Sequence, residues 1–194
     1  MDSRGAYFNG SSYLGTASKT VPANFSMSIW VRPISWGNAT FFATCDSGGT
    51  NATIYGIYAS AGSVNYYAGS AAHTSEVSGW SSNILTPELL TLETVVCNTS
   101  TPTLTGYRNG VQVASVTYGG GGASYPLAIG RLGAYAGYYF NGYLQDARIY
   151  DTSLSPNEVI DLYRRGPNDI YNVSRYHKSG IYLPALARNG GFGR

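Results

Sequence analysis

Acidic side chains are the first residues in this sequence that could carry out catalysis, but their spacing argues against it. Hydrolysis of a glycosidic bond needs two carboxyl groups about 5 to 10 Å apart. On one strand, such a pair would sit at i and i+2 or i+4, because alternate side chains share a face. Glu88 and Glu93 are five positions apart, as are Asp146 and Asp151, and no E-x-D-x-x-E or E-x-E pattern occurs. We therefore expect no glycosidase.

Other catalytic patterns are also missing from the sequence. There is no G-x-S-x-G motif, and His73 and His177 have no recognisable catalytic partner. The two Cys and two His residues do not have zinc-ligand spacing. The glycine run 119–122 lacks the Lys and helix that follow a phosphate-binding loop. The sequence predicts a protein that is not an enzyme and that uses no cofactor.

Aromatic side chains point instead to binding. The chain has 18 Tyr and 3 Trp, and flat aromatic faces on a rigid protein suit the C–H faces of sugar rings. For every such residue, ordinary packing in a core or against another protein is the alternative. The candidates for glycan stacking, chosen because we expect them in or near loops, are Trp36, Tyr66, Tyr67, Trp80, Tyr135, Tyr138 and Tyr139.

Composition limits where the protein works. Only 11% of the residues are charged, against roughly 25% in ordinary soluble domains. Such a surface suits a rigid all-β protein that works outside the cytosol or on a particle. We find neither a secretory signal nor an apolar run of about 18 residues that would span a membrane. We expect a chain that is made and kept without secretion, the alternative being a domain excised from a secreted protein.

Cys45 and Cys97 are too few for a disulfide framework. We expect both to be small buried side chains. A disulfide between them is possible only if their Cα atoms lie within about 7 Å.

Charge is distributed unevenly along the chain. Residues 1–163 carry six Lys or Arg against nine Asp or Glu, whereas residues 164–194 carry six against one. A basic, aromatic-rich arm over 166–194 is expected to bind an acidic partner, and packing across its own domain is the alternative. Nucleic acid is not expected, because the cations are widely spaced. The residues predicted to bind the partner are Arg164, Arg165, Arg175, Tyr176, Lys178, Tyr182 and Arg188.

Turn residues recur every 8 to 15 positions and separate short β patterns, which is typical of an antiparallel sandwich or jelly roll. Asn109-Gly110 predicts a two-residue hairpin turn. Residues 70–88 are expected to be a loop. The predicted strands lie within 5–16, 25–33, 39–45, 53–59, 63–68, 89–97, 103–108 and 111–118, with two more between 126 and 150.

One helix is predicted, over residues 156–165. Ser155 is a good N-cap residue, and Glu158 three positions later completes a capping box. Pro156 suits the first helical position, and Gly166-Pro167 ends the helix. We therefore divide the chain into a domain over 1–165 and the arm over 166–194.

Several segments together resemble the laminin-G-like, concanavalin A-like lectin/glucanase jelly-roll family. The resemblance covers about residues 5–163 and implies a two-sheet antiparallel sandwich that ends in one short helix, here followed by an extended tail. The family's Trp-x-His pair is replaced by Leu92 and Thr94. The segments that carry the resemblance are AYFNGSSYLGT (6–16), FSMSIWVRP (25–33), TLTGYRNGVQV (103–113), LAIGR (127–131) and YFNGYLQDARIYDTSLSPNEVIDLY (139–163).

Members of this family often hold calcium at the rim of the sandwich. Calcium requires six to eight oxygen ligands, and only Asp46 and Asp151 are placed to contribute. They are weak candidates, and no metal site is predicted.

These observations lead to a functional expectation. We expect a non-enzymatic structural or decoration protein of a bacteriophage virion, anchored to other virion proteins by its C-terminal arm. Its jelly roll would be displayed on the virion surface and would bind host or environmental glycans such as cell-surface polysaccharide. A homo-oligomer is compatible with this function. The alternative is an extracellular carbohydrate-binding or adhesion module of a secreted bacterial protein.

Overall fold

The computed structural model describes most of the expected domain and a short piece of the tail. The described residues are 5–35, 37–44, 55–60, 63–68, 77–118, 123–132, 138–167 and 181–182; the side chains of 17–19, 77–84, 123–125 and 181–182 are not described.

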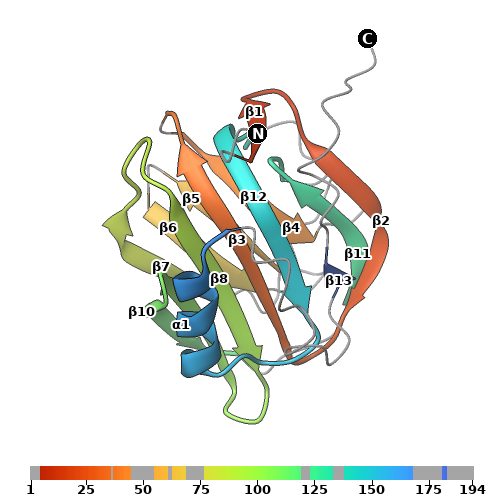
Figure 1. Cartoon of the computed structure of the whole chain (residues 1–194). Helices are drawn as coiled ribbons and strands as arrows, with labels where there is room; N and C mark the ends of the chain where they lie inside the picture. The colour runs from red at the N-terminus through yellow and green to blue at the C-terminus, as the bar shows by residue number, and fades with distance from the viewer. Residues whose placement is uncertain are drawn as a thin grey trace.

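Two antiparallel sheets pack face to face (Figure 1). The front sheet has the order β1 (Ala6–Asn9), β12 (Asn141–Tyr150), β3 (Phe25–Pro33), β8 (Thr91–Asn98), β9 (Thr103–Arg108) and β10 (Val111–Thr117), and β13 (Ile181–Tyr182) also pairs with β12. The back sheet has the order β2 (Leu14–Val21), β11 (Ala123–Ile129), β4 (Ala39–Thr44), β5 (Tyr55–Ser60), β6 (Ser63–Ala68) and β7 (Val77–Ile84). This confirms the predicted concanavalin A-like jelly-roll sandwich.

Strand β3 shows why the two sheets hold together. Phe25, Met27 and Ile29 are fully buried in the core between the sheets. Trp30 points the other way, into a second apolar cluster with residues of the helix α1 (Pro156–Arg165). Both faces of the strand are therefore buried, one by the back sheet and one by the helix.

The predicted helix and its caps are confirmed. The Ser155 hydroxyl accepts a hydrogen bond from the Glu158 amide at 3.3 Å, and the Glu158 carboxylate accepts one from the Ser155 amide at 2.7 Å. Val159 and Leu162 are buried against the outer face of the front sheet. The helix therefore covers part of the outer face of the front sheet (Figure 1).

Strand pairing corrects one prediction and confirms another. Residues 77–84, expected to lie in a loop, form β7 and pair with β6. Their Ser- and Gly-rich sequence has no alternating pattern, so pairing with a neighbouring strand stabilises a segment whose own propensity is weak.

Asn109 and Gly110 have φ angles of +53° and +81°, as the predicted hairpin turn requires.

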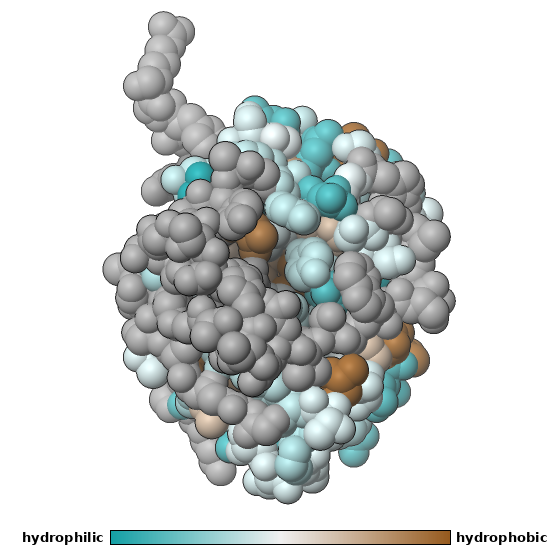
Figure 2. Space-filling model, turned by 180° about the vertical axis from the view of Figure 1, so that it is seen from behind, coloured by the Kyte–Doolittle hydropathy of each residue, from teal (hydrophilic) through white to brown (hydrophobic). Residues whose placement is uncertain are grey.

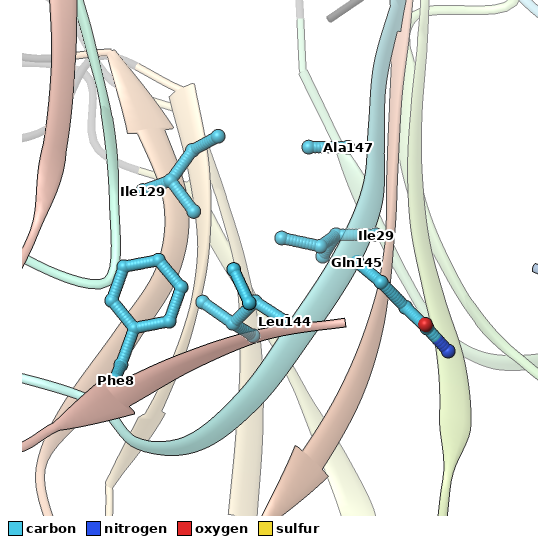
Figure 3. Close-up of a pocket in the computed structure, with 7 residues that line it drawn as sticks. Phe8, Ile29, Ile129, Leu144, Gln145 and Ala147 are labelled. Carbon is cyan, nitrogen blue, oxygen red and sulfur yellow. The ribbon is translucent and has the colours of Figure 1, made fainter. Parts of the chain in front are cut away.

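A small apolar recess lies where β1 and β12 meet the core (Figure 3). Phe8, Leu144 and Ile129 point into it, whereas the amide of Gln145 points away. The side chains leave no room for a water-sized molecule. The recess is therefore a packing feature and not a ligand site.

Candidate functional site

The outer face of the back sheet carries a row of residues set by strand register. Thr40 of β4 lies opposite Tyr58 of β5, Tyr58 lies opposite Asn65 of β6, and Asn65 lies opposite Trp80 of β7. Directly opposed residues lie on the same face of a sheet. The side chains of Thr40, Tyr58 and Asn65 therefore lie on one face of three neighbouring strands, at the same level.

Burial shows which face this is. Tyr55 and Ile57 of β5 and Tyr66 of β6 belong to the core between the sheets. Because side chains alternate along a strand, Tyr58 and Asn65 must point away from that core. Figure 2 views the molecule from behind and shows a hollow near the centre of the face, where pale and brown side chains meet.

Two tyrosine rings flank that of Tyr58, whose hydroxyl is bonded to Asn65. The ring of Tyr58 lies 6.4 Å from that of Tyr67 and 6.4 Å from that of Tyr138, with both pairs edge to face. Tyr138 is 36% exposed. We call Thr40, Tyr58, Asn65, Tyr67 and Tyr138 the back-sheet site.

Tyr138 has an unusual backbone conformation. Its φ is +56°, a region that costs a residue with a side chain roughly 1 kcal/mol or more. The amide of Thr40 donates a hydrogen bond to the Tyr138 carbonyl at 2.8 Å and ties this segment to β4. Strained residues of this kind cluster at binding sites, and here the strain accompanies an exposed ring.

Two buried polar atoms in the site have no partner. Asn65 is 1% exposed; its Nδ2 donates to the Tyr58 hydroxyl at 2.6 Å, but its Oδ1 accepts nothing. Thr40 is fully buried, and its Oγ1 is also unpaired. Each such atom costs about 1 to 3 kcal/mol. A surface used only for packing would gain by replacing them with apolar groups.

A polar network lies on the inner side of strand β6. The Tyr66 hydroxyl donates to Glu93 at 2.5 Å, and Arg108 Nε donates to the same carboxylate at 2.7 Å. Burial raises the pKa of Glu93, against the opposing effects of Arg108 and Tyr66. Burial and the nearby carboxylate raise the pKa of Tyr66, so its hydroxyl stays protonated and donates. The network fixes β6 against the front sheet.

A second group of aromatic residues surrounds Arg131. Its guanidinium lies 3.6 Å from the centre of the Tyr13 ring and 6.0 Å from that of Tyr139. Tyr13 is 46% exposed and Tyr139 is half-buried. This cluster combines a cation with aromatic rings, and the back-sheet site does not.

The structure divides the predicted stacking residues into three groups. Tyr138 is exposed and Tyr139 is half-buried. Tyr66 points into the core, so its prediction as a stacking residue is wrong, whereas Tyr67 is buried beside Tyr58 in the back-sheet site. Only the backbone of Trp80 is described, and Trp36 and Tyr135 lie outside the described residues.

Sequence reasoning missed Thr40, Tyr58 and Asn65. All three lie inside strands, where we expected structural residues. The signal that would have found them is cross-strand register, which requires knowing which strands pair and at what offset.

The arm residues lie partly within the described chain. Arg164 and Arg165 form the last turn of α1, and Tyr182 belongs to β13, which pairs with β12 of the same molecule. The backbone of residues 181–182 thus pairs with the domain of its own molecule. Arg175, Tyr176, Lys178 and Arg188 lie outside the described residues.

The weaker candidates have mixed outcomes. Cys97 is buried and forms no disulfide, and burial raises its pKa to about 12. Asp151 follows β12 and is half-buried, whereas Cys45 and Asp46 are not described. Within the described ranges, no three His, Cys, Asp or Glu side chains gather as a metal site would require. Nor is any helix in those ranges long and apolar enough to cross a bilayer.

Comparison with known proteins identifies the family to which this fold belongs. The sequence profile of the concanavalin A-like lectin/glucanases superfamily, in its laminin G form, matches residues 8–160. The chain belongs to this superfamily. No curated protein sequence matches it.

Solved structures of the superfamily share the fold at low sequence identity. The heptameric SAP-like pentraxin of Limulus polyphemus is 16% identical, with a TM-score of 0.68 over 97% of this chain and 100% of the pentraxin. Domain 4 of the arabinanase AbnA of Geobacillus stearothermophilus, solved with arabinotriose, is 22% identical, with a TM-score of 0.63 over 81% and 75%. The Ruminococcus gnavus sialidase CBM40, bound to α2,3 sialyllactose, is 11% identical, with a TM-score of 0.62 over 76% and 97%.

Proposed function

We propose that this concanavalin A-like domain is a non-catalytic carbohydrate-binding protein and that the back-sheet site holds the glycan. Sugar rings stack on aromatic faces, and their hydroxyls both donate and accept hydrogen bonds. The site combines the 36% exposed Tyr138 with the unpaired polar atoms of Asn65 and Thr40, which are buried among the same strands. These are the two kinds of contact that a sugar makes.

One observation carries the proposal. The Asn65 Oδ1 and Thr40 Oγ1 atoms are buried without partners beside a cluster of tyrosines. Two of the solved structures with a similar fold were determined with an oligosaccharide bound, arabinotriose and sialyllactose, which supports the class of ligand.

The acidic residues are consistent with a non-catalytic role. Glu93 lies in the core and is bonded to Tyr66 and Arg108. Asp146 forms a bidentate pair with Arg148, with distances of 2.7 and 2.6 Å. Both carboxylates are thus bonded to arginine side chains within the protein.

A glycan array followed by calorimetry tests the proposal. The purified protein should bind at least one polysaccharide class, and Tyr138→Ala should weaken that binding about 10-fold or more, as losing one stacking ring costs about 1 to 2 kcal/mol. Tyr7→Ala is the matched control, because Tyr7 is a 51% exposed tyrosine on the front sheet. No binding across the array, or equal losses in both variants, would contradict the proposal.

We propose the place of the protein on a bacteriophage virion separately. It is supported by the low charge of the domain and the basic residues after Tyr163, and it does not depend on the back-sheet site. Mass spectrometry of purified particles tests it. Absence of the protein from the particles would favour the alternative, an extracellular adhesion module.

A further inference from the structure

We infer that Arg131 and the two tyrosines beside it, Tyr13 and Tyr139, form a second binding site, for a sugar that carries a carboxylate. We call these three residues the arginine site. It is built from other side chains than the back-sheet site, and the inference does not depend on the proposed function. Three observations support it: the neighbours of the guanidinium, the accessibility of its outer end and the fixed backbone beside it.

The neighbours of Arg131 distinguish it from other arginines of the sandwich. Arg32, Arg108 and Arg148 each have a carboxylate oxygen within 3.2 Å. Among the described residues, no carboxylate is paired with Arg131, and the segment that follows it, 132–137, contains no Asp or Glu. Its charge is therefore not balanced by any acidic side chain that the structure describes.

Tyrosine rings hold the guanidinium instead. It lies over the Tyr13 ring, 3.6 Å from the ring centre, and 6.0 Å from the centre of the Tyr139 ring. A cation over an aromatic ring uses the flat face of its guanidinium, whereas its N–H donors point outward in the plane. An arginine held in this way keeps its fork of donors for a carboxylate, which it can bind with two parallel hydrogen bonds.

The outer end of this side chain is accessible. Arg131 is half-buried, and its Nε is buried without a hydrogen-bond partner. The two Nη atoms also lack a partner among the described residues, but they are not buried, so they face solvent. Tyr13 is 46% exposed. A ligand can therefore reach the terminal donors and the neighbouring ring from the surface, without a closed cavity.

The backbone beside Arg131 is fixed. The amide of Gly130 donates to the Phe41 carbonyl of β4 at 3.1 Å, and the amide of Phe140 donates to the Gly130 carbonyl at 2.9 Å. Tyr13 directly precedes β2, which pairs with β11 in the back sheet. Strand pairing thus places the cation and the ring together before a ligand arrives, which lowers the entropic cost of binding.

The combination of a cation with an exposed ring favours a sugar over a simple anion. One exposed ion pair changes an affinity by only about five-fold or less, so a small carboxylate such as acetate should bind very weakly. A sugar that carries a carboxylate can also pack its C–H face on the exposed part of the Tyr13 ring. Both parts of the arginine site are then used by one ligand.

The arginine site and the back-sheet site meet at consecutive residues but use different rings. The Tyr138 ring lies 6.4 Å from that of Tyr58 in the back-sheet site, whereas the Tyr139 ring lies 6.0 Å from the Arg131 guanidinium. Substitutions at Tyr138 and at Arg131 should therefore affect different ligands.

The test titrates the full chain with trigalacturonate and with its methyl ester, followed by NMR. The two probes have the same sugar rings, and only the acid is charged. We expect the acid to bind about five-fold more tightly at low salt, the upper end for an exposed pair. This preference should disappear at about 0.5 M sodium chloride, because salt screens exposed charges. The side-chain N–H signals of Arg131 should shift with the acid alone.

Variants locate the contact. Arg131→Gln should remove the preference for the acid, whereas Tyr13→Ala should weaken the binding of both probes. Arg32→Gln is the matched control, because Arg32 also lies over a tyrosine, Tyr143 at 4.6 Å, but is paired with Glu88. It should leave the preference unchanged. The comparison of the two probes on the wild-type protein stands even where a variant fails to fold.

Several outcomes would overturn the inference. They are equal affinity for the acid and the ester, binding of neither probe, and equal losses in Arg32→Gln and Arg131→Gln. Acetate that binds as tightly as trigalacturonate would show an anion site that does not recognise sugars. Tyr138→Ala should leave binding of the acid unchanged. If it abolishes that binding, the acid lies in the back-sheet site, and the second site is overturned while the proposed function stands.

Discussion

At the scale of single residues, Asn65 is where stability and binding should conflict. Its amide donates to Tyr58 while its Oδ1 is buried and unpaired. A packing role would favour an apolar residue of similar size at this position. Under the proposed function, the amide at this position serves a group that is not part of the protein.

Replacing Asn65 with leucine separates the two roles. Asn65→Leu should leave the free energy of unfolding unchanged or raise it by about 1 kcal/mol, because the orphaned acceptor is removed. The same variant should lose glycan binding. Denaturant unfolding and calorimetry on one preparation measure both quantities. A variant that is clearly less stable than wild type would show that the amide is a structural residue.

Gly106 shows how closely the two sheets approach. A Cβ atom at this position would overlap the ring of Tyr66 from the opposite sheet. We expect Gly106→Ala to lower stability by about 3 kcal/mol, the upper end for overpacking, because Tyr66 is fully buried and bonded to Glu93. Gly37→Ala, where a Cβ would meet nothing within 4 Å, is the control. Equal melting temperatures for the two variants would contradict the prediction.

At the scale of elements, local chemistry was sufficient for some predictions. The helix over 156–165 and the turn at 109–110 were predictable because capping groups and positive φ angles depend on a few adjacent residues. Strand β3 was predictable from its alternation.

Elements that depend on distant partners were harder to predict. Strand β7 has no alternating pattern and is defined by its pairing with β6. The back-sheet site was missed for the same reason, since Thr40, Tyr58 and Asn65 are brought together only by register. Sequence reasoning did find Tyr138 because its ring lies in a loop, where exposure can be guessed from the neighbouring residues.

The helix cap provides a test at this scale. Ser155→Ala should destabilise the protein by about 1 kcal/mol, because it removes the hydroxyl that accepts from the Glu158 amide. Asn157→Ala, at an exposed position in the same turn, should have little effect. Thermal unfolding followed by circular dichroism distinguishes them. The apolar cluster under the helix should keep the Ser155→Ala variant folded.

At the scale of the whole molecule, the two outer faces of the sandwich differ. The front sheet is covered in part by α1 through Trp30, Val159 and Leu162. The back sheet presents the register row, and its strand β6 is bonded through the core to the front sheet by Tyr66 and Glu93. The buried pair of Glu93 and Arg108 thus supports the back sheet from within.

Breaking this buried pair should have a large effect that depends on pH. Arg108→Met leaves the Glu93 carboxylate buried without a cation, and we expect a loss of about 3 kcal/mol at neutral pH. Burial already raises the pKa of Glu93 above its ordinary value of 4.5, and Arg108 opposes that rise. In the variant, the folded state therefore holds the Glu93 proton more tightly than the unfolded chain does. The contribution of Glu93 to the free energy of unfolding of the variant is then greatest below about pH 4.5 and is lost as the pH rises.

Denaturant unfolding across this pH range measures the effect. The difference between wild type and Arg108→Met should shrink as the pH falls toward 4.5. Arg32→Met is the control, because its partner Glu88 is 58% exposed at the side chain, and such surface pairs contribute about 1 kcal/mol or less. A constant difference at all pH values would mean that Glu93 does not titrate in the folded protein.

Strand β12 has a further consequence for engineering. Its residues 141–144 pair with β1, and its residues 148–149 pair with β13, which lies far along the tail. Positions from opposite ends of the polypeptide are thus neighbours along a single strand. A short added peptide could join them, and the exposed turn at 99–102 between β8 and β9 could then be opened. The fold is therefore suited to circular permutation, or to insertion as a unit into a loop of another protein.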